Sequence, residues 1–575
     1  MDRADLVIKH VFIYNSVFQK FFLADVYVLN GKIYYIDTKQ DASIACDHSI
    51  DGTGKYMVPG LVDVHMHIES SMMTPNAMAR RLVECGVTTI ISEPHEIANV
   101  NGMQGVKDIM DAGNDALIDI YYGIPSCVPA TNPSLETTGG IMECDDMKAL
   151  LDHPKVTCIG EVMNYRQVIK ENDLAIGRLL DYLGKERPDY IIEGHCPALV
   201  DLDLAKFLYL GIDSDHTEHN IEELKQRFFN GMYVELQEKM MRQEVIDFIM
   251  EHDLYGHFGF VTDDVMADTL MQVGHLDAVV RKAMKLGMPF EKAIYHATYT
   301  NAVRMRLFDR TMLTPGKLAD FILLDDLYEF DIFATYKKGK CVYQKGQIQE
   351  HANESHVFPD AYRHSIKVSP ITKEQLRVMV QEDAKHVLVE VMEVNDGTTK
   401  TTHKQAELEV VDHEIVWENS DILLCVVMER YGKHQDLQIG YGFVSGDCIK
   451  KGAVATSFAH DHHNLLAVGS NADDLLLAIN NVIDMQGGFS VVNDGQEQAR
   501  LHLPVGGILS DAPANEIAHD LLQVRSAMIN QGYVHYNPIM SLCTLSLLCS
   551  PALKISDKGI VDVKKGEVIP LYTVI

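Results

Sequence analysis

Two histidines one residue apart stand in an apolar segment near the start of the chain. Residues 62–70 read VDVHMHIES and follow directly on MVPGL. On a β-strand, alternate side chains point to the same face, so His65 and His67 would project together into the space that the strand lines. Two imidazoles on one side of a strand indicate a shared ligand.

Other histidines and carboxylates stand at the ends of later apolar segments of strand character. If these segments are successive strands of one barrel, four imidazoles and at least two carboxylates meet at one rim. Such a set suits two divalent metal ions, each with about four to six ligands and with a shared anionic bridge. The first, fourth, fifth, sixth and eighth segments end in His65-Met66-His67, Gly160-Glu161, His195, Asp215-His216 and Asp263-Asp264.

Each of these residues also has a structural explanation when it is taken alone. A single histidine such as His195 or His216 is more often a hydrogen-bonded core residue than a ligand. Glu161 could be one partner of a buried salt bridge, and Asp263-Asp264 could cap the following helix. The common position at the same end of successive strands favours the metal site, because unrelated structural roles would not share one rim.

A pair of cations at this rim indicates hydrolysis. Two cations that hold one water lower its pKa and supply hydroxide near neutral pH. A carboxylate beside that water, for which Asp263 is the candidate, can accept the proton and pass it to the leaving group. Attack of hydroxide on a carbon that bears nitrogen predicts hydrolytic deamination or amide hydrolysis.

Eight short apolar segments alternate with segments of helical periodicity, and these elements must position the rim residues. In the first helical segment, Thr74-Pro75 places a capping hydroxyl before a first-turn proline, and Gly86 ends the helix. Eight such βα units over about 200 residues predict a (β/α)8 TIM-like barrel, whose functional groups gather at the carboxyl ends of the strands. The predicted strands span residues 61–68, 87–92, 118–125, 156–162, 190–195, 212–216, 232–237 and 258–263.

Other units flank the barrel, which we predict over residues 60–313. Residues 1–59 alternate as short strands with a turn at Asn30-Gly31, and residues 314–350 return to strand character. We expect both flanks to form one small β-sandwich unit. The polar, proline-containing stretch 350–370 is typical of a linker, and residues 370–575 predict a separate C-terminal α/β domain.

Composition narrows the classes of partner. The chain has 575 residues, and 50 Lys and Arg against 82 Asp and Glu give a formal net charge of −32, which repels phosphate backbones and anionic membranes. The start lacks a signal-peptide pattern, and no run of about 18 apolar residues occurs. The 11 cysteines include no C-x-x-C pair and indicate reduced thiols. We expect a cytoplasmic protein with neither nucleic acid nor membrane as a partner.

Several longer stretches resemble one family. In the barrel they are VPGLVDVHMHIESSMMTP, SEPHEIANVNG, IGEVMNY, GHCPAL, SDHTE and TDD, and in the C-terminal domain SFAHDHHNLLAVGSNADDLLLAIN and LPVGGILSDAPANE. Through them the chain resembles, over nearly its whole length, the adenine deaminases of the metal-dependent amidohydrolase superfamily. The resemblance implies an aminohydrolase that converts adenine to hypoxanthine and ammonia in purine salvage. It also implies two divalent ions, manganese or iron before zinc, and we expect a homodimer.

The same resemblance implies a role for each residue of the rim. His65 and His67 would bind one ion together with Asp263. His195 and His216 would bind the second ion. Glu161 would bridge both ions, where many members of the superfamily use a carboxylated lysine, and Asp263 would also move the proton.

The sequence leaves open which residues act around this core. The donor that protonates the purine ring could be Glu161, Glu93 or Glu96. His95 and Glu96 in SEPHEIAN follow the second strand, where they could contact the substrate or belong to a loop held by local hydrogen bonds.

A second histidine cluster, His460-Asp461-His462-His463, stands in the C-terminal domain between two strand-like runs. Its candidate residues His460, Asp461 and His463 could form a lid over the barrel mouth, from this subunit or a neighbouring one. They could also bind a further cation or belong to a solvated turn. Family members commonly have serine where His462 stands.

A second departure from the family pattern affects the substrate. Members commonly show Arg-Glu-Gly-Ser after the seventh strand, whereas this chain has Gln237-Glu238-Lys239-Met240. Glu238 is therefore a candidate substrate contact, and the heterocycle stays open. The alternatives are a deaminase of another aminopurine, a cyclic amide hydrolase, and a non-catalytic barrel relative that would have lost its ligands.

Overall fold

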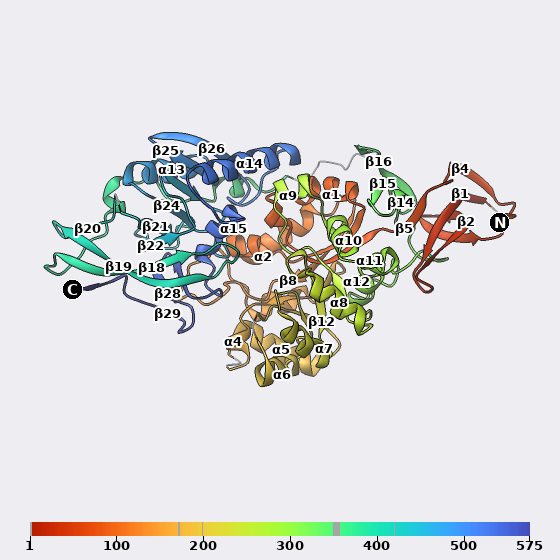
Figure 1. Ribbon diagram of the computed structural model, residues 1–575, viewed down its shortest axis with the longest axis horizontal. Coiled ribbons are helices and arrows are strands. Elements are labelled where there is room, and N and C mark those ends of the chain that lie inside the picture. Colours follow the sequence, from red (N-terminus) through yellow and green to blue (C-terminus); the bar gives the residue numbers. More distant parts are fainter. Residues whose placement is uncertain (1–2, 171–172, 198, 349–356, 419) are drawn as a thin grey trace.

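The protein is an elongated molecule with three units in a row, as the computed structural model in Figure 1 shows. The N-terminal β unit lies at one end, the barrel in the middle and the C-terminal unit at the other end. The structure describes residues 3–170, 173–197, 199–348, 357–418 and 420–575. Within these ranges, none of the helices combines the length and the apolar character that crossing a membrane requires.

Eight strands form the centre of the middle unit and confirm the predicted barrel. Parallel ladders join them into a five-stranded sheet, ordered β10-β9-β8-β7-β6, and a three-stranded sheet, ordered β11-β12-β13. The strands are β6 (Leu61–Met66), β7 (Val87–Ser92), β8 (Asp119–Ile124), β9 (Val156–Val162), β10 (Ile191–Gly194), β11 (Ser214–Asp215), β12 (Tyr233–Leu236) and β13 (Phe258–Phe260).

Side chains and isolated backbone hydrogen bonds, such as Asp263 N–H to the His65 carbonyl at 3.1 Å, complete the barrel at the two seams between these sheets. At one seam, the Asn301 side-chain amide donates to the carbonyl oxygens of Val62 and Phe260, both at 2.7 Å. At the other, the Gly194 N–H donates to Ser214 Oγ at 3.2 Å instead of to a backbone carbonyl. The Asp213 N–H also donates to the Ile192 carbonyl at this seam, at 3.4 Å, but β10 and β11 belong to separate sheets, and β11 is two residues long where the sequence predicts five.

Helices follow the barrel strands, as the alternating pattern predicts. The first begins at Pro75 and buries Met78, Leu82 and Val83, and Gly86 after it has a φ of 74°, where glycine is unstrained. Thr74 is at the N-cap position as predicted, but the predicted capping bond is wrong, because its hydroxyl makes no capping hydrogen bond. The helices of this unit are α1 (Pro75–Glu84), α2 (His95–Ala112), α3 (Cys144–Leu150), α4 (Tyr165–Val168), α5 (Ala175–Glu186), α6 (Asp201–Tyr209), α7 (Ile221–Phe229), α8 (Gln243–Glu251), α9 (Ala267–Gln272), α10 (Leu276–Lys285), α11 (Phe290–His296) and α12 (Tyr299–Arg304).

Strands from both flanks of the barrel join in one nine-stranded sheet. The strand before the barrel, β5, pairs antiparallel with β14, the first strand after it. The predicted turn at Asn30-Gly31 joins β2 to β3, with φ of 52° and 72°. The strands are β1 (Arg3–Asn15), β2 (Lys20–Leu29), β3 (Lys32–Asp37), β4 (Ala45–Asp51), β5 (Tyr56–Pro59), β14 (Phe321–Asp326), β15 (Asp331–Lys337), β16 (Lys340–Gln344) and β17 (Gln347–Ile348).

The predicted linker 350–370 is described only from residue 357 onwards, and residues 350–356 lie outside the described ranges. Its described part includes the 3-10 turn Asp360–His364, in which Tyr362 is buried. The Tyr362 hydroxyl donates to Asp108 on α2 at 2.7 Å. This part of the stretch is therefore packed against the barrel.

The C-terminal unit is built on a ten-stranded sheet with two long helices, α13 and α14, and a small sheet of β27, β28 and β29. Its elements are β18 (His386–Val394), β19 (Thr401–Val411), β20 (Glu414–Val416), β21 (Leu423–Met428), β22 (Ile439–Gly446), β23 (Ala453–Thr456), β24 (Leu465–Gly469), α13 (Ala472–Asp484), β25 (Gly488–Asn493), β26 (Gln496–His502), α14 (Ala514–Asn530), α15 (Pro538–Cys543), β27 (Leu553–Ser556), β28 (Gly559–Asp562), β29 (Glu567–Val568) and β30 (Tyr572–Val574).

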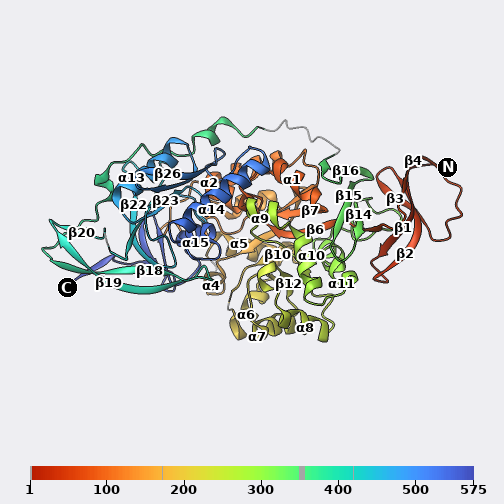
Figure 2. The ribbon, with the colours of Figure 1, turned by 45° about the horizontal axis from the view of Figure 1, so that its top comes forward.

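This unit packs on the barrel through segments that follow the strand ends. Figure 2 shows α14 and α15 beside α2 and α9. Arg525 on α14 forms an ion pair of 2.6 Å with Asp268 on α9, and the Asn464 side-chain amide donates to the Thr137 carbonyl at 2.8 Å. The C-terminal unit thus lies against the face of the barrel where functional groups gather.

Candidate metal centre at the barrel rim

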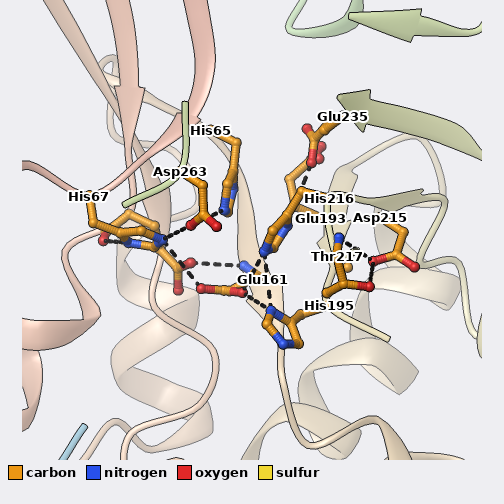
Figure 3. Close-up of polar contacts among 12 residues, drawn as sticks. His65, His67, Glu161, Glu193, His195, Asp215, His216, Thr217, Glu235 and Asp263 are labelled. Carbon is orange, nitrogen blue, oxygen red and sulfur yellow. Dashed lines mark hydrogen bonds and ion pairs between the residues drawn. The ribbon is translucent and has the colours of Figure 1, made fainter. Parts of the chain in front are cut away.

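The six residues predicted to bind metal lie together at the carboxyl ends of the barrel strands. Figure 3 shows their side chains turned toward one another around Glu161. Two belong to strands β6 and β9, and the others follow the ends of β6, β10, β11 and β13 directly or within three residues. We call them the rim cluster, and they are His65, His67, Glu161, His195, His216 and Asp263.

Glu161 is at the centre of the rim cluster, and its two carboxylate oxygens face different histidines. Oε2 lies 2.6 Å from His195 Nδ1 and 3.2 Å from His216 Nε2. Oε1 lies 3.4 Å from His67 Nε2. A carboxylate with one oxygen toward each of two groups of imidazoles has the arrangement that a bridge between two cations requires.

A buried histidine nitrogen without a partner also supports metal binding by the rim cluster. His65 Nε2 is buried, has no hydrogen-bond partner among the described residues, and lies 3.8 Å from Asp263 Oδ1. The same oxygen lies 3.5 Å from His67 Nε2. A buried imidazole nitrogen without a partner costs free energy unless something binds it. Three potential ligand atoms, one from each of His65, His216 and Asp263, all lie within 4.8 Å of one another. This spacing leaves room for an ion between them.

The backbone after β7 fixes the orientation of His67. Its Nδ1 lies 3.0 Å from the carbonyl oxygen of Glu93, which can only accept a hydrogen bond. In the neutral ring the proton is therefore on Nδ1, and Nε2 directs its lone pair at the rim cluster. Such an acceptor behind a histidine is the usual companion of a metal ligand.

The electrostatics of the rim cluster favour a neutral His65 beside an ionised Glu161. Burial and the neighbouring His216 lower the pKa of His65 to about 3, so its ring is neutral near pH 7. Burial alone would raise the pKa of Glu161, but His195 and His216 hold it well below its usual range. Against the effect of burial, Glu161 raises the pKa of His216 to about 9. The cluster therefore provides an anionic carboxylate without any covalent modification.

Two family models and a set of relatives match this chain. The model described as Amidohydrolase family matches residues 56–348, and the one described as Adenine deaminase C-terminal domain matches residues 398–567. An adenine deaminase of Clostridium perfringens is 44% identical over 574 residues, which are 99% of this chain and 100% of that protein. Adenine deaminase 2 of Shouchella clausii is 43% identical over 572 residues, 99% of each chain.

The chain belongs to the adenine deaminase family. The region matched by the Amidohydrolase family model contains the whole rim cluster, and the region matched by the Adenine deaminase C-terminal domain model contains His460 to His463. Adenine deaminase relatives that match from end to end include both regions, so the comparison covers the barrel and the unit that lies against its rim.

In this member of the adenine deaminase family, Glu93 and His95 lie beside Glu161. Glu93 Oε2 accepts a hydrogen bond of 3.0 Å from the Glu161 N–H, and His95 Nδ1 lies 3.9 Å from Glu161 Oε1. A side chain at Gly160 would have its Cβ 2.3 Å from Glu93 Cδ, so the glycine gives this carboxyl group its space. The structure thus brings Glu93 and His95 to the rim cluster, with Glu96 behind them.

The C-terminal histidine cluster is buried against the barrel of the same chain. His460 Nδ1 lies 2.6 Å from Glu96 Oε1, and His463 Nε2 is in contact with Glu96 Oε2. Asp461 Oδ1 lies 4.0 Å from His95 Nε2. The interpretation as a solvated turn is wrong, because all four residues from His460 to His463 are buried.

The two departures from the adenine deaminase pattern have different surroundings. The Gln237 amide is buried and donates to the carbonyl oxygen of His216 at 2.7 Å, so this residue positions a histidine of the rim cluster. Glu238 is exposed and pairs with Lys282, and the structure does not bring it to the rim cluster. His462 Nδ1 accepts from the N–H of Asn464 at 3.0 Å.

Sequence reasoning missed Arg227, which ties together the loops that position His195 and His216. Its side chain is fully buried on α7, pairs with Asp215 at 2.8 Å and donates to the Cys196 carbonyl at 2.8 Å. The only indication in the sequence is that this arginine stands next to two phenylalanines in LKQRFF. That indication is weak, because most arginines are exposed whatever their neighbours in the sequence.

Arg227→Met is expected to lower the free energy of unfolding by about 3–5 kcal/mol, because it leaves the buried Asp215 carboxylate without its guanidinium partner. Chemical denaturation at neutral pH measures this change. Arg242→Met is the matched control, since Arg242 pairs with Glu218 and Glu244 at the surface and should cost less than about 1 kcal/mol. Equal, small effects in both variants would contradict the role given to Arg227.

Proposed function

We propose that this protein deaminates adenine to hypoxanthine and ammonia, with two divalent ions held by the rim cluster. The observation that supports this most directly is Glu161, whose two oxygens face separate imidazoles. Relatives named adenine deaminase that match the full length support the choice of adenine.

The ligands divide around Glu161. We assign His65, His67 and Asp263 to one ion, His195 and His216 to the other, and Glu161 to both. Imidazole and carboxylate ligands suit manganese and iron, which we propose as the ions, and zinc is the alternative. Bound ions would lower the pKa of water at the rim and so supply hydroxide near neutral pH.

Asp263 is suited to move the proton. Burial alone would raise the pKa of this carboxyl group, but His67 and His216 hold it well below its usual range. Asp263 is therefore ionised near neutral pH and can accept a proton from water. As the C6–O bond forms and the C6–N bond breaks, Asp263 passes that proton to the departing nitrogen, which leaves as ammonia.

Glu93 is better suited than Glu96 to protonate the purine ring. Burial and the nearby Glu161 raise the pKa of Glu93 to about 8, so it holds a proton near pH 7. Its Oε1 is buried and has no hydrogen-bond partner among the described residues. Glu96 instead faces His460 and His463.

An activity assay tests the proposal. The purified protein is stripped with a chelator, reloaded with Mn²⁺ or Fe²⁺, and incubated with adenine. We expect hypoxanthine and ammonia in equal amounts, followed by ultraviolet absorbance and an ammonia assay. If the protein hydrolysed a cyclic amide and left adenine unchanged, it would be a ring-opening hydrolase rather than a deaminase. If the metal-loaded protein acted on neither compound, it would be a non-catalytic relative.

A further inference from the structure

A second group of potential metal ligands lies between the barrel and the C-terminal unit. Its members are His95 and Glu96 in the first turn of α2, and Asp461 in the loop between β23 and β24. Three potential ligand atoms, one from each of these residues, all lie within 4.8 Å of one another. His95 Nε2 is 3.7 Å from Glu96 Oε1 and 4.0 Å from Asp461 Oδ1.

The two carboxylates of this group are buried, and among the described residues neither forms an ion pair with a lysine or an arginine. Glu96 is 1% exposed and Asp461 is 3% exposed. Among the described residues, all their ion pairs are with histidines, namely His95, His460 and His463. Two buried carboxylates need compensating positive charge, because desolvation of an unpaired charge is costly.

The unpartnered atoms identify where that charge is missing. Asp461 Oδ2 is buried and has no hydrogen-bond partner among the described residues, and Asp461 Oδ1 lies 3.5 Å from His460 Nδ1 and 4.0 Å from His95 Nε2. Glu96 Oε1 lies 2.6 Å from His460 Nδ1 but outside hydrogen-bond geometry. Glu96 thus has a histidine in contact with each of its oxygens, whereas Asp461 has imidazole nitrogens only at 3.5 and 4.0 Å from Oδ1 and no hydrogen-bond partner among the described residues for Oδ2.

We propose that His95, Glu96 and Asp461 bind a third divalent cation, in addition to the two ions of the proposed active centre. The donor set of one imidazole and two carboxylates selects a first-row transition ion such as Mn²⁺, Fe²⁺ or Zn²⁺. Bonds of about 2.0–2.2 Å from one ion place neighbouring donors about 3.0–3.6 Å apart, so a small closure of the three side chains completes the site.

The third ion would join two units and orient one residue of the active centre. Asp461 comes from the C-terminal unit and Glu96 from the barrel, so coordination fastens the unit to the rim. With Nε2 on this ion, His95 would keep its proton on Nδ1, which lies 3.9 Å from both Glu93 Oε1 and Glu161 Oε1. His95 is then a positioning residue for those two carboxylates.

Metal counting tests this proposal without using deamination as the readout. The stripped full-length protein is titrated with Mn²⁺, and bound ions per chain are measured by elemental analysis and by electron paramagnetic resonance of free Mn²⁺. We expect three ions in the wild type and two in Asp461→Asn. A wild-type protein that saturates at two ions overturns the proposal whether or not any variant folds, and so does an Asp461→Asn variant that keeps the wild-type number.

Asp557→Asn is the matched control. Asp557 is also buried in the C-terminal unit and also contacts the barrel, since it accepts hydrogen bonds from Thr137 N at 2.9 Å and Thr137 Oγ1 at 2.7 Å. It should keep three ions, and loss of an ion there would show that docking of the unit, rather than Asp461, controls the count. A protein with three ions that leaves adenine untouched would keep this inference and overturn the proposed function.

Discussion

Glu161→Gln is expected to remove both ions of the rim cluster together and to lower kcat/KM by about a thousandfold or more. The amide is isosteric with the carboxylate, but it is neutral and has one oxygen where the carboxylate has two. Glu161 faces His67 through one oxygen and His195 and His216 through the other. A loss of about 4 kcal/mol in transition-state stabilisation, which a bound cation can supply, corresponds to that factor.

The measurement pairs metal content with steady-state kinetics on adenine. Glu238→Gln is the matched control, because Glu238 is exposed and pairs with Lys282. We expect that variant to keep its ions and most of its activity. If Glu161→Gln lost only one ion, or kept both, the bridging role of Glu161 would be wrong.

Asp263→Asn is expected to lower kcat by about 10²–10⁴, the usual contribution of a positioned general base. Asparagine keeps the shape of the side chain and one oxygen near His67, but it cannot accept the proton from water. The acidic limb of the pH–kcat profile should also change, since that limb reports an essential group that acts in its ionised form. Kinetics on protein of known metal content separate this loss from a loss of ions.

The neighbouring Asp264→Asn variant distinguishes the two adjacent carboxylates. Asp264 is partly exposed and accepts a hydrogen bond from the Ser70 hydroxyl, which gives its side chain a structural partner. We expect a loss of about tenfold at most, the range for a supporting residue. A larger loss in Asp264→Asn than in Asp263→Asn would reassign the proton transfer.

The sequence specified the barrel because its signals are local. The apolar runs of β7 and β9 match the predicted ranges in full, since a strand buried on both faces is read directly from consecutive apolar residues. The turn at Asn30-Gly31 and the helix start at Thr74-Pro75 depend on the chemistry of a few neighbouring residues. The short β11 could not be predicted, because at its seam with β10 the Gly194 N–H bonds the side chain of Ser214, a tertiary contact that no local pattern indicates.

The residues of the rim cluster were identifiable from the sequence because each stands at the end of its own strand, and parallel strands in a barrel direct those ends to one face. Their number and type determined that metal chemistry was the leading hypothesis. What only the tertiary structure decided is how separate segments meet. Glu161 turns one oxygen to each side, Arg227 holds two loops, and Asp461 reaches Glu96 across more than 360 positions of chain, because burial brings together charges that no local pattern relates.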